Sequence, residues 1–91
     1  MTPTFAEFEN DARARGFDQV LERHWGADTL VATHSHPFDA SALVVMGEMW
    51  LTVGDQTQHL RVGDTFALPR GTAHDERYGS QGATYWVARR G

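Results

Sequence analysis

The spacing of apolar residues along the chain differs before and after Gly16. Before Gly16, apolar residues recur at spacings of three and four, which predicts one face of an amphipathic helix. These residues are Phe5, Phe8 and Ala12. Thr4 and Glu7 have the spacing of a capping box, and Gly16 is a suitable stop. The sequence therefore predicts a short N-terminal helix, within residues 1–16, that packs on the rest of the chain.

After Gly16 the apolar positions alternate with polar ones, as they do in β-strands. The clearest signal is a hairpin in MWLTVGDQTQHLRVGD, residues 49–64. Met49, Leu51 and Val53 alternate with polar-face residues, Gly54-Asp55 supplies the turn, and Leu60 and Val62 resume the alternation. Further short strands are predicted over residues 20–25, 30–36 and 42–46 and within TFALP and ATYWVARR. Six or more short strands with frequent turns indicate a closed or two-sheet antiparallel structure over residues 17–91.

Composition narrows the class of protein. A chain of 91 residues makes one domain, with a hydrophobic set of 41% and charged residues at 22%. The net charge of −4 and the lack of a basic patch argue against a nucleic-acid partner. There are no cysteines, which removes disulfides and thiolate chemistry. No apolar run approaches the length of a membrane span, and we expect a soluble, cytoplasmic protein.

Two histidines on alternate positions, in HSHP at residues 34–37, are the first candidate site. Residues i and i+2 of a strand point to the same face, so His34 and His36 aim at one point. Leu30 and Ala32 precede them on that face, which predicts that both imidazoles point inward. The opposite face carries Val31, Thr33 and Ser35. Burial of unpartnered imidazoles is costly and a shared metal ion removes that cost, although the same spacing also fits a polar surface.

A third histidine follows a turn in GDTFALPRGTAH, residues 63–74. Phe66 and Leu68 alternate as inward-facing residues of a short strand. The residues Pro69-Arg70-Gly71 favour a turn, and His74 stands three residues after Gly71.

These two stretches resemble the paired motifs of the cupin family, in a small single-domain form. The first motif, with H-x-H and a later glycine, matches at His34, His36 and Gly47. The second matches with correct spacing at Gly63, Pro69, Gly71 and His74. Fifteen residues separate Gly47 from Gly63, a short connection of the kind seen in small cupins. H-x-H alone is weak, but both motifs in order and at this separation are specific.

The resemblance implies an all-β jelly-roll barrel over residues 17–91, with the helix packed on it. It also implies that His34, His36 and His74 are three ligands of a divalent transition metal. Three imidazoles with open positions suit zinc, iron, nickel or copper better than magnesium or calcium. The alternative is a polar pocket without metal, because some cupins have lost the ion.

The sequence departs from the family pattern at two positions of the expected site. Ala40 stands where the first motif has a glutamate, and Tyr78 stands where the second has an asparagine. Asp39 is next to the vacant position, but it reaches the metal only if Pro37-Phe38 distorts the backbone. Asp75 or Glu76 can orient His74 as a hydrogen-bond acceptor, although exposed charges at a strand end are the default. Tyr78 and Tyr85 are further possible proton donors.

Two functions remain open at this point. The first is a metal-dependent enzyme that acts on a small, anionic molecule, because a site without a carboxylate keeps the full charge of the ion. The second is a non-catalytic cupin that binds or senses a small ligand, with or without metal. A barrel filled by its own side chains is a third possibility. His59 is expected to be a solvated strand residue and His24 a structural one.

A homodimer is expected, because a barrel this short has little core and exposed sheet edges. Trp50 lies on the otherwise polar face of its strand, where a second subunit can cover it. By comparison with related small cupins, the segment Phe17 to Trp25 is expected to pair with the neighbouring subunit.

Overall fold

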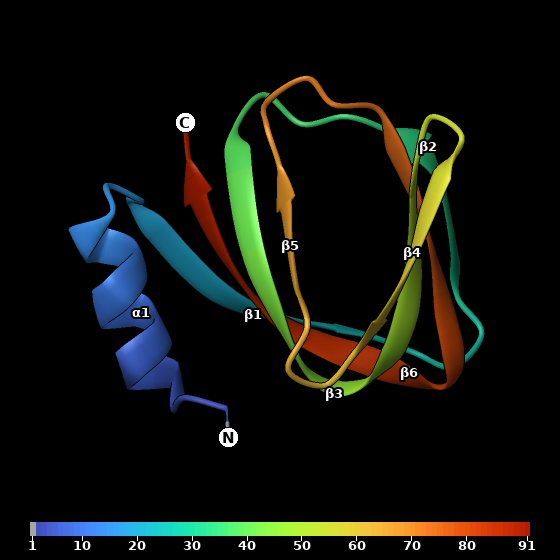
Figure 1. Ribbon diagram of the computed structural model, residues 1–91, viewed down its shortest axis with the longest axis horizontal. Coiled ribbons are helices and arrows are strands. Elements are labelled where there is room, and N and C mark those ends of the chain that lie inside the picture. Colours follow the sequence, from blue (N-terminus) through green and yellow to red (C-terminus); the bar gives the residue numbers. More distant parts are fainter. Residues whose placement is uncertain (1) are drawn as a thin grey trace.

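The computed structural model describes residues 2–91 (Figure 1). One helix precedes a series of strands that curl into a barrel. The elements are α1 (Phe5–Ala14), β1 (Gln19–Trp25), β2 (Leu30–His34), β3 (Asp39–Val53), β4 (Gln56–Arg61), β5 (Thr65–Leu68) and β6 (His74–Arg90). The prediction of an all-β fold with a short N-terminal helix is confirmed.

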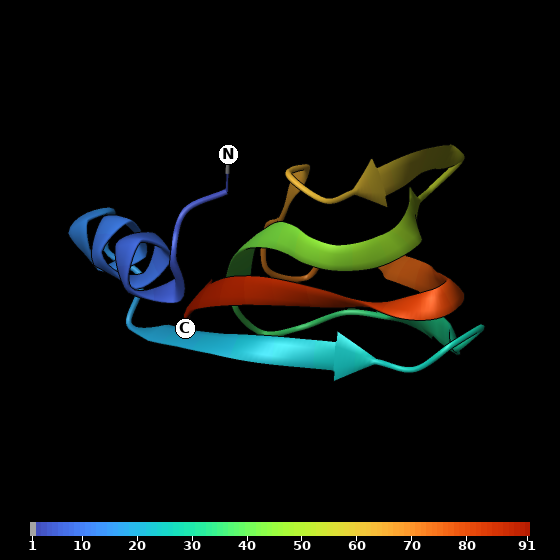
Figure 2. The ribbon, with the colours of Figure 1, turned by 90° about the horizontal axis from the view of Figure 1, so that it is seen from below.

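The two longest strands, β3 and β6, pair antiparallel and run through both halves of the barrel. In one half, β1 pairs with residues 83–89 of β6, and β5 pairs with residues 40–43 of β3. In the other half, β2 pairs with the start of β6, and β4 pairs with the end of β3. Two four-stranded layers, joined by the two shared strands, make the jelly roll. Figure 2 shows β1, β6 and β3 side by side.

Glycines shape the corner at which β3 and β6 pass from one layer to the other. The register between the two strands shifts around Met46 and Gly47, so the corner contains bulges. Gly47 and Gly82 both have φ of +71°. A Cβ on Gly47 would overlap the carbonyl oxygen of Gly82, and one on Gly82 would overlap the carbonyl oxygen of Trp25. The short strand predicted at 42–46 is therefore wrong in extent, because it continues through this corner into Met49–Val53.

Helix α1 is capped as predicted and packs on the outside of the barrel (Figure 1). The amide of Glu7 donates to Oγ1 of Thr4, and the Glu7 carboxylate accepts from the amide of Thr4. Phe5 contacts Trp86 edge to face, with ring centroids 5.4 Å apart, and Phe8 lies against the same indole. The apolar face of the helix therefore covers the outer side of β6.

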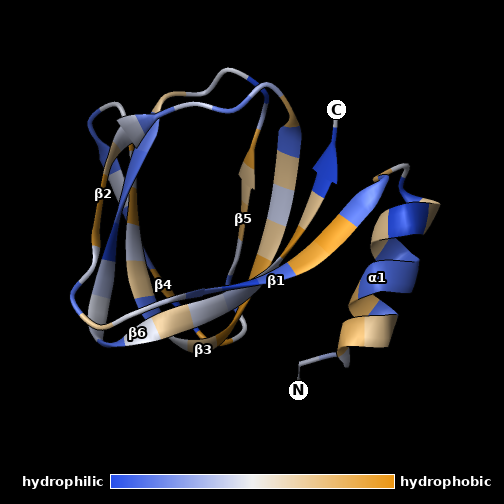
Figure 3. Cartoon of the chain, turned by 180° about the vertical axis from the view of Figure 1, so that it is seen from behind, coloured by the Kyte–Doolittle hydropathy of each residue, from blue (hydrophilic) through white to orange (hydrophobic). Residues whose placement is uncertain are grey.

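The barrel interior is filled by alternate residues of the strands, and hydrophobic positions intersperse with hydrophilic ones along them (Figure 3). Met49, Leu51 and Leu60 are buried, as the hairpin alternation predicts. Phe66 and Leu68 are also buried. The prediction for Val62 is wrong: β4 ends at Arg61, and the Val62 side chain, which lies in the following turn, is 53% exposed.

Strand β1 pairs with β6 of the same chain along its whole length, from Gln19 opposite Arg89 to Trp25 opposite Ala83. β1 is the end strand of the order β1-β6-β3-β4, so β6 occupies one of its two edges. The pairing of the segment Phe17 to Trp25 with a neighbouring subunit stays a prediction. Among residues 2–91, no helix is long and apolar enough to cross a membrane.

Candidate metal centre

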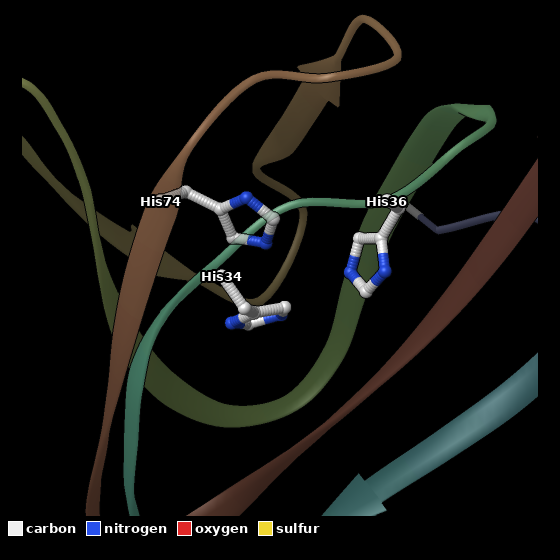
Figure 4. Close-up of side chains that lie close together, drawn as sticks. All are labelled: His34, His36 and His74. Carbon is white, nitrogen blue, oxygen red and sulfur yellow. The ribbon is translucent and has the colours of Figure 1, made fainter.

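Three imidazoles converge inside the barrel, near the loop that follows β2 (Figure 4). His34 is the last residue of β2, His36 lies in the following loop, and His74 is the first residue of β6. One ring nitrogen from each lies within 4.8 Å of the others. His74 is 2% exposed, and the other two are half-buried. The structure thus brings together the three histidines that the motifs single out.

The strand alternation that suggested this inward orientation is wrong for β2. Leu30 is 74% exposed and pairs with Arg77 on the outer face, whereas Val31 packs against the core. The register breaks between Val31 and His34, and this irregularity places His34 opposite His74 on the inner side. The strand also ends at His34 rather than at the predicted His36. The histidines converge because of a bulge, not because of a regular alternation.

Backbone carbonyls orient two of the three rings. Nδ1 of His34 lies 2.8 Å from the carbonyl oxygen of Ala32, and Nδ1 of His74 lies 2.9 Å from that of Thr72. A carbonyl oxygen only accepts, so Nδ1 carries the proton in both rings. Each Nε2 then presents a lone pair to the interior, which is the form that a metal ligand requires.

His36 completes the cluster from the loop. Its ring stacks on Phe38, with centroids 4.8 Å apart and planes 15° apart. Burial lowers the pKa of His36 first, and the neighbouring His34 and His74 lower it further. The neutral imidazole, with one free lone pair, is therefore favoured at this position.

Glu76 is a fourth member of the cluster, in a role that the sequence interpretation did not assign to it. Its carboxylate Oε2 lies 3.6 Å from Nε2 of His34 and 3.6 Å from Nε2 of His74. The side chain is only 7% exposed, and the hydroxyl of Tyr78 donates to its other oxygen, Oε1. His74, Glu76 and Tyr78 alternate along one strand, so the spacing H-x-E was the signal that could have identified the carboxylate.

Aromatic residues hold this carboxylate in place. The Trp25 ring stacks on Tyr78 with centroids 5.4 Å apart, and Nε1–H of Trp25 donates to the Tyr85 hydroxyl over 3.3 Å. Burial, the neighbouring Tyr85 and the hydrogen bond to Glu76 raise the pKa of Tyr78. Tyr78 therefore stays protonated and donates to Glu76. The residue at the position of the family's asparagine thus points into the site.

The other positions considered for a carboxylate ligand lie on different faces of their strands. Ala40 is 8% exposed and lines the interior beside the histidines, so the position of the family's glutamate does face inward. Asp39 accepts from the backbone amide of Arg70 over 2.8 Å and lies 3.5 Å from Arg90, away from the cluster. Asp75 lies on the outer face of β6, because its side chain alternates with those of His74 and Glu76.

The remaining two histidines lie outside the site. Nε2 of His59 is 2.8 Å from the Glu48 carboxylate, and its ring stacks on Trp50 at 4.4 Å with planes 5° apart. His59 is thus on the outer face as predicted, although it is packed rather than fully solvated. Nδ1 of His24 bonds the Thr84 hydroxyl over 2.8 Å, which fits the expected structural role.

A small cavity adjoins the histidines in the barrel interior. Its volume is about 30 Å³, which is enough for a water molecule or a small chemical group. Its lining combines polar groups of the site with apolar side chains, and among the polar ones are His36, His74, Glu76 and Arg89.

Comparison with known proteins identifies the family. Residues 23–88 match the family described as Cupin domain. The chain therefore belongs to the cupin family, as its two motifs indicated. A comparison with curated proteins gives no match.

Solved structures show the same fold. KdgF from Halomonas sp. is 19% identical with a TM-score of 0.67, covering 79% of this chain and 68% of its own. An RmlC-like cupin from Shewanella frigidimarina NCIMB 400 is 19% identical with a TM-score of 0.68, covering 79% and 65%. The DMSP lyase DddQ from Ruegeria pomeroyi DSS-3 is 23% identical with a TM-score of 0.73, covering 79% and 37%. These likenesses concern the barrel alone, since the chain spans between about a third and two thirds of those proteins.

Proposed function

We propose that the protein is a small metal-dependent cupin enzyme that acts on a small molecule. An anionic substrate no longer follows from a site without a carboxylate, because Glu76 lies among the histidines. His34, His36 and His74 would hold a divalent transition metal, and Glu76 would be the carboxylate of the set. The single observation that carries this proposal is the convergence of the three imidazoles within 4.8 Å at one point of the interior. Imidazole nitrogens with a carboxylate oxygen are a donor set suited to zinc, iron, nickel or copper.

The protonation pattern supports the proposal independently. Two Nδ1 atoms are committed to backbone carbonyls, and both Nε2 atoms face the same carboxylate oxygen. At 3.6 Å, Nε2 and Oε2 are too far apart for a hydrogen bond. A coordinated metal ion occupies the space between its ligand atoms. Ligand atoms that lie close together without a hydrogen bond between them leave that space for the ion.

Glu76 and Tyr78 are the two side chains that, beside the histidines, would shape the metal site. The site departs from the family motif because its carboxylate comes from β6 rather than from position 40 at the start of β3. Tyr78 holds one oxygen of Glu76 and leaves the other directed at the histidines. When bound, a metal of this kind supplies Lewis acidity and lowers the pKa of a coordinated water. His74 and Glu76 are buried, and burial strengthens the electrostatic interactions that these two groups make.

The chain shares its fold with KdgF and with DddQ, a protein named as a DMSP lyase. A shared fold does not imply a shared reaction, so the proposal names neither a reaction nor a particular metal. The alternative is a cupin that binds or senses a small ligand without turning it over. That alternative predicts ligand binding without product formation.

Element analysis of the protein purified without a histidine tag tests the metal site. About one equivalent of a divalent transition metal is expected in the wild type and in His59→Ala, because His59 lies on the outer face. His34→Ala and His74→Ala should each lose most of the metal while keeping the β-rich circular dichroism spectrum. Equal metal content in the wild type and both site variants would refute the three-histidine site.

A further inference from the structure

Two arginines on neighbouring strands lie beside the candidate metal centre. Arg89 comes from β6, where it shares the inward face with Val87 and Tyr85. It lines the small cavity that His36 and Glu76 also line. Arg23 comes from β1, opposite Tyr85 in the antiparallel register, and cross-strand partners share one face of a sheet. The two arginines therefore lie on the same, inner face of the paired strands β1 and β6.

Neither guanidinium has an anionic partner in the part of the chain that the structure describes. The ion pairs of arginine within residues 2–91 are made by Arg13, Arg15, Arg70 and Arg90. Nε of Arg89 is buried and has no hydrogen-bond partner at all. The sequence has 12 acidic side chains against 8 arginines, so carboxylates are not scarce. A buried guanidinium nitrogen left without a partner beside a cavity indicates that an external anion completes it.

Each of the two guanidinium groups lies over an aromatic ring. Cζ of Arg89 lies 4.6 Å from the centroid of the Phe38 ring, and Cζ of Arg23 lies 5.2 Å from the centroid of the Trp25 ring. Phe38 also stacks on His36, so one ring bridges the arginine and the histidine cluster. A guanidinium over an aromatic ring does not use its N–H groups in that contact, so they can form paired hydrogen bonds with a carboxylate.

We propose that the cavity binds the carboxylate group of a small organic acid, with Arg89 as its main partner and Arg23 as an additional positive charge. This deepens the proposed function, on which it rests for the metal side of the pocket. The cavity lined by Arg89 and His36 has a volume of only about 30 Å³, and a carboxylate is a smaller anionic group than phosphate.

Acetate is the smallest probe of this site, and acetamide is its uncharged counterpart. NMR titration of the metal-loaded wild type at low ionic strength should show saturable acetate binding, no acetamide binding and weaker binding of inorganic phosphate. Arg89→Gln should weaken acetate binding about tenfold or more, because it removes charge-assisted hydrogen bonds. Arg89→Lys should be intermediate, and Arg23→Gln should weaken binding about threefold. The matched control is Arg61→Gln, an exposed arginine on β4, which should change affinity less than twofold.

The outcomes separate this inference from the metal proposal. Metal content is measured on each variant and should be unchanged in Arg89→Gln and Arg89→Lys. If the wild type holds no metal but still binds acetate, with loss in Arg89→Gln, the metal proposal fails and the carboxylate site stands. Acetate affinity equal in the wild type and in both folded Arg89 variants would overturn the inference. Phosphate binding tighter than acetate would overturn the assigned ligand class.

Discussion

Glu76 stands two residues after His74 on β6, and its Oε2 lies 3.6 Å from Nε2 of that histidine. Successive inward positions of one strand thus supply a nitrogen and an oxygen donor to the same space. The family motif would instead supply the carboxylate from position 40. The fold accommodates either source, because Ala40 and Glu76 both line the cavity beside His74.

Removing the charge of Glu76 should weaken metal binding while the barrel stays folded. Glu76→Gln keeps the shape of the side chain and its contact with Tyr78, but loses the negative charge beside the histidines. Loss of a group that binds or orients at a metal site costs about 10- to 100-fold in affinity. Competition with a chromophoric chelator measures this change. Asp75→Asn is the matched control on the outer face, and an equal effect in both variants would show that Glu76 has no direct role.

Moving the carboxylate to position 40 should restore the lost affinity. In the Glu76→Gln background, Ala40→Glu places a negative charge on the same cavity from the opposite side, where the family motif has it. Metal affinity should rise at least about tenfold over Glu76→Gln alone. The double variant with Ala40→Gln controls for side-chain size. If glutamate and glutamine at position 40 give the same affinity in folded proteins, the side chain of residue 40 does not reach the site.

The corner of the barrel should be intolerant of a methyl group at Gly82. This glycine has φ of +71°, and a Cβ there would overlap the carbonyl oxygen of Trp25. Gly82→Ala should lower the free energy of unfolding by about 3 kcal/mol or more, since strain and overpacking add. Gly54→Ala is the control: its φ is +61°, but nothing lies near the added atom, so about 1 kcal/mol is expected. Urea unfolding of the variants checks this, and equal losses would locate the cost in φ alone.

Trp50 offers a test of the predicted homodimer. Its indole lies between His59, at 4.4 Å, and the Arg77 guanidinium, at 4.0 Å, and stays half-buried on the outer face. If a second copy covers this face, Trp50→Ala should weaken dimerisation by on the order of 2 kcal/mol and leave metal content unchanged. Sedimentation or light scattering over a range of concentrations measures the dimer constant. A wild-type monomer at high concentration would contradict the dimer, and a dimer unaffected by the change would place the interface elsewhere.

The local structure and the family could be predicted from the residues alone. Thr4 and Glu7 predicted the capped helix, because a capping box depends only on residues three apart. The hairpin around Gly54-Asp55 was readable for the same reason, since alternation and turn chemistry are local. The three histidines were identified through motif spacing, and they do converge. The inward position of Ala40 also followed from that alignment.

Pairing between distant strands sets which groups surround the histidines and how the histidines reach the interior. Alternation placed Leu30 inward, but the break in register after Val31 reverses the faces of β2, and a bulge depends on the partner strand rather than on local sequence. The role of Glu76 was missed because an acidic residue near a strand end is usually exposed, and its burial depends on the pairing with Val31 and Leu51. Likewise, nothing in the sequence places Arg23 on the same inner face as Arg89, since 66 positions separate them and only the antiparallel pairing of β1 with β6 brings their strands together.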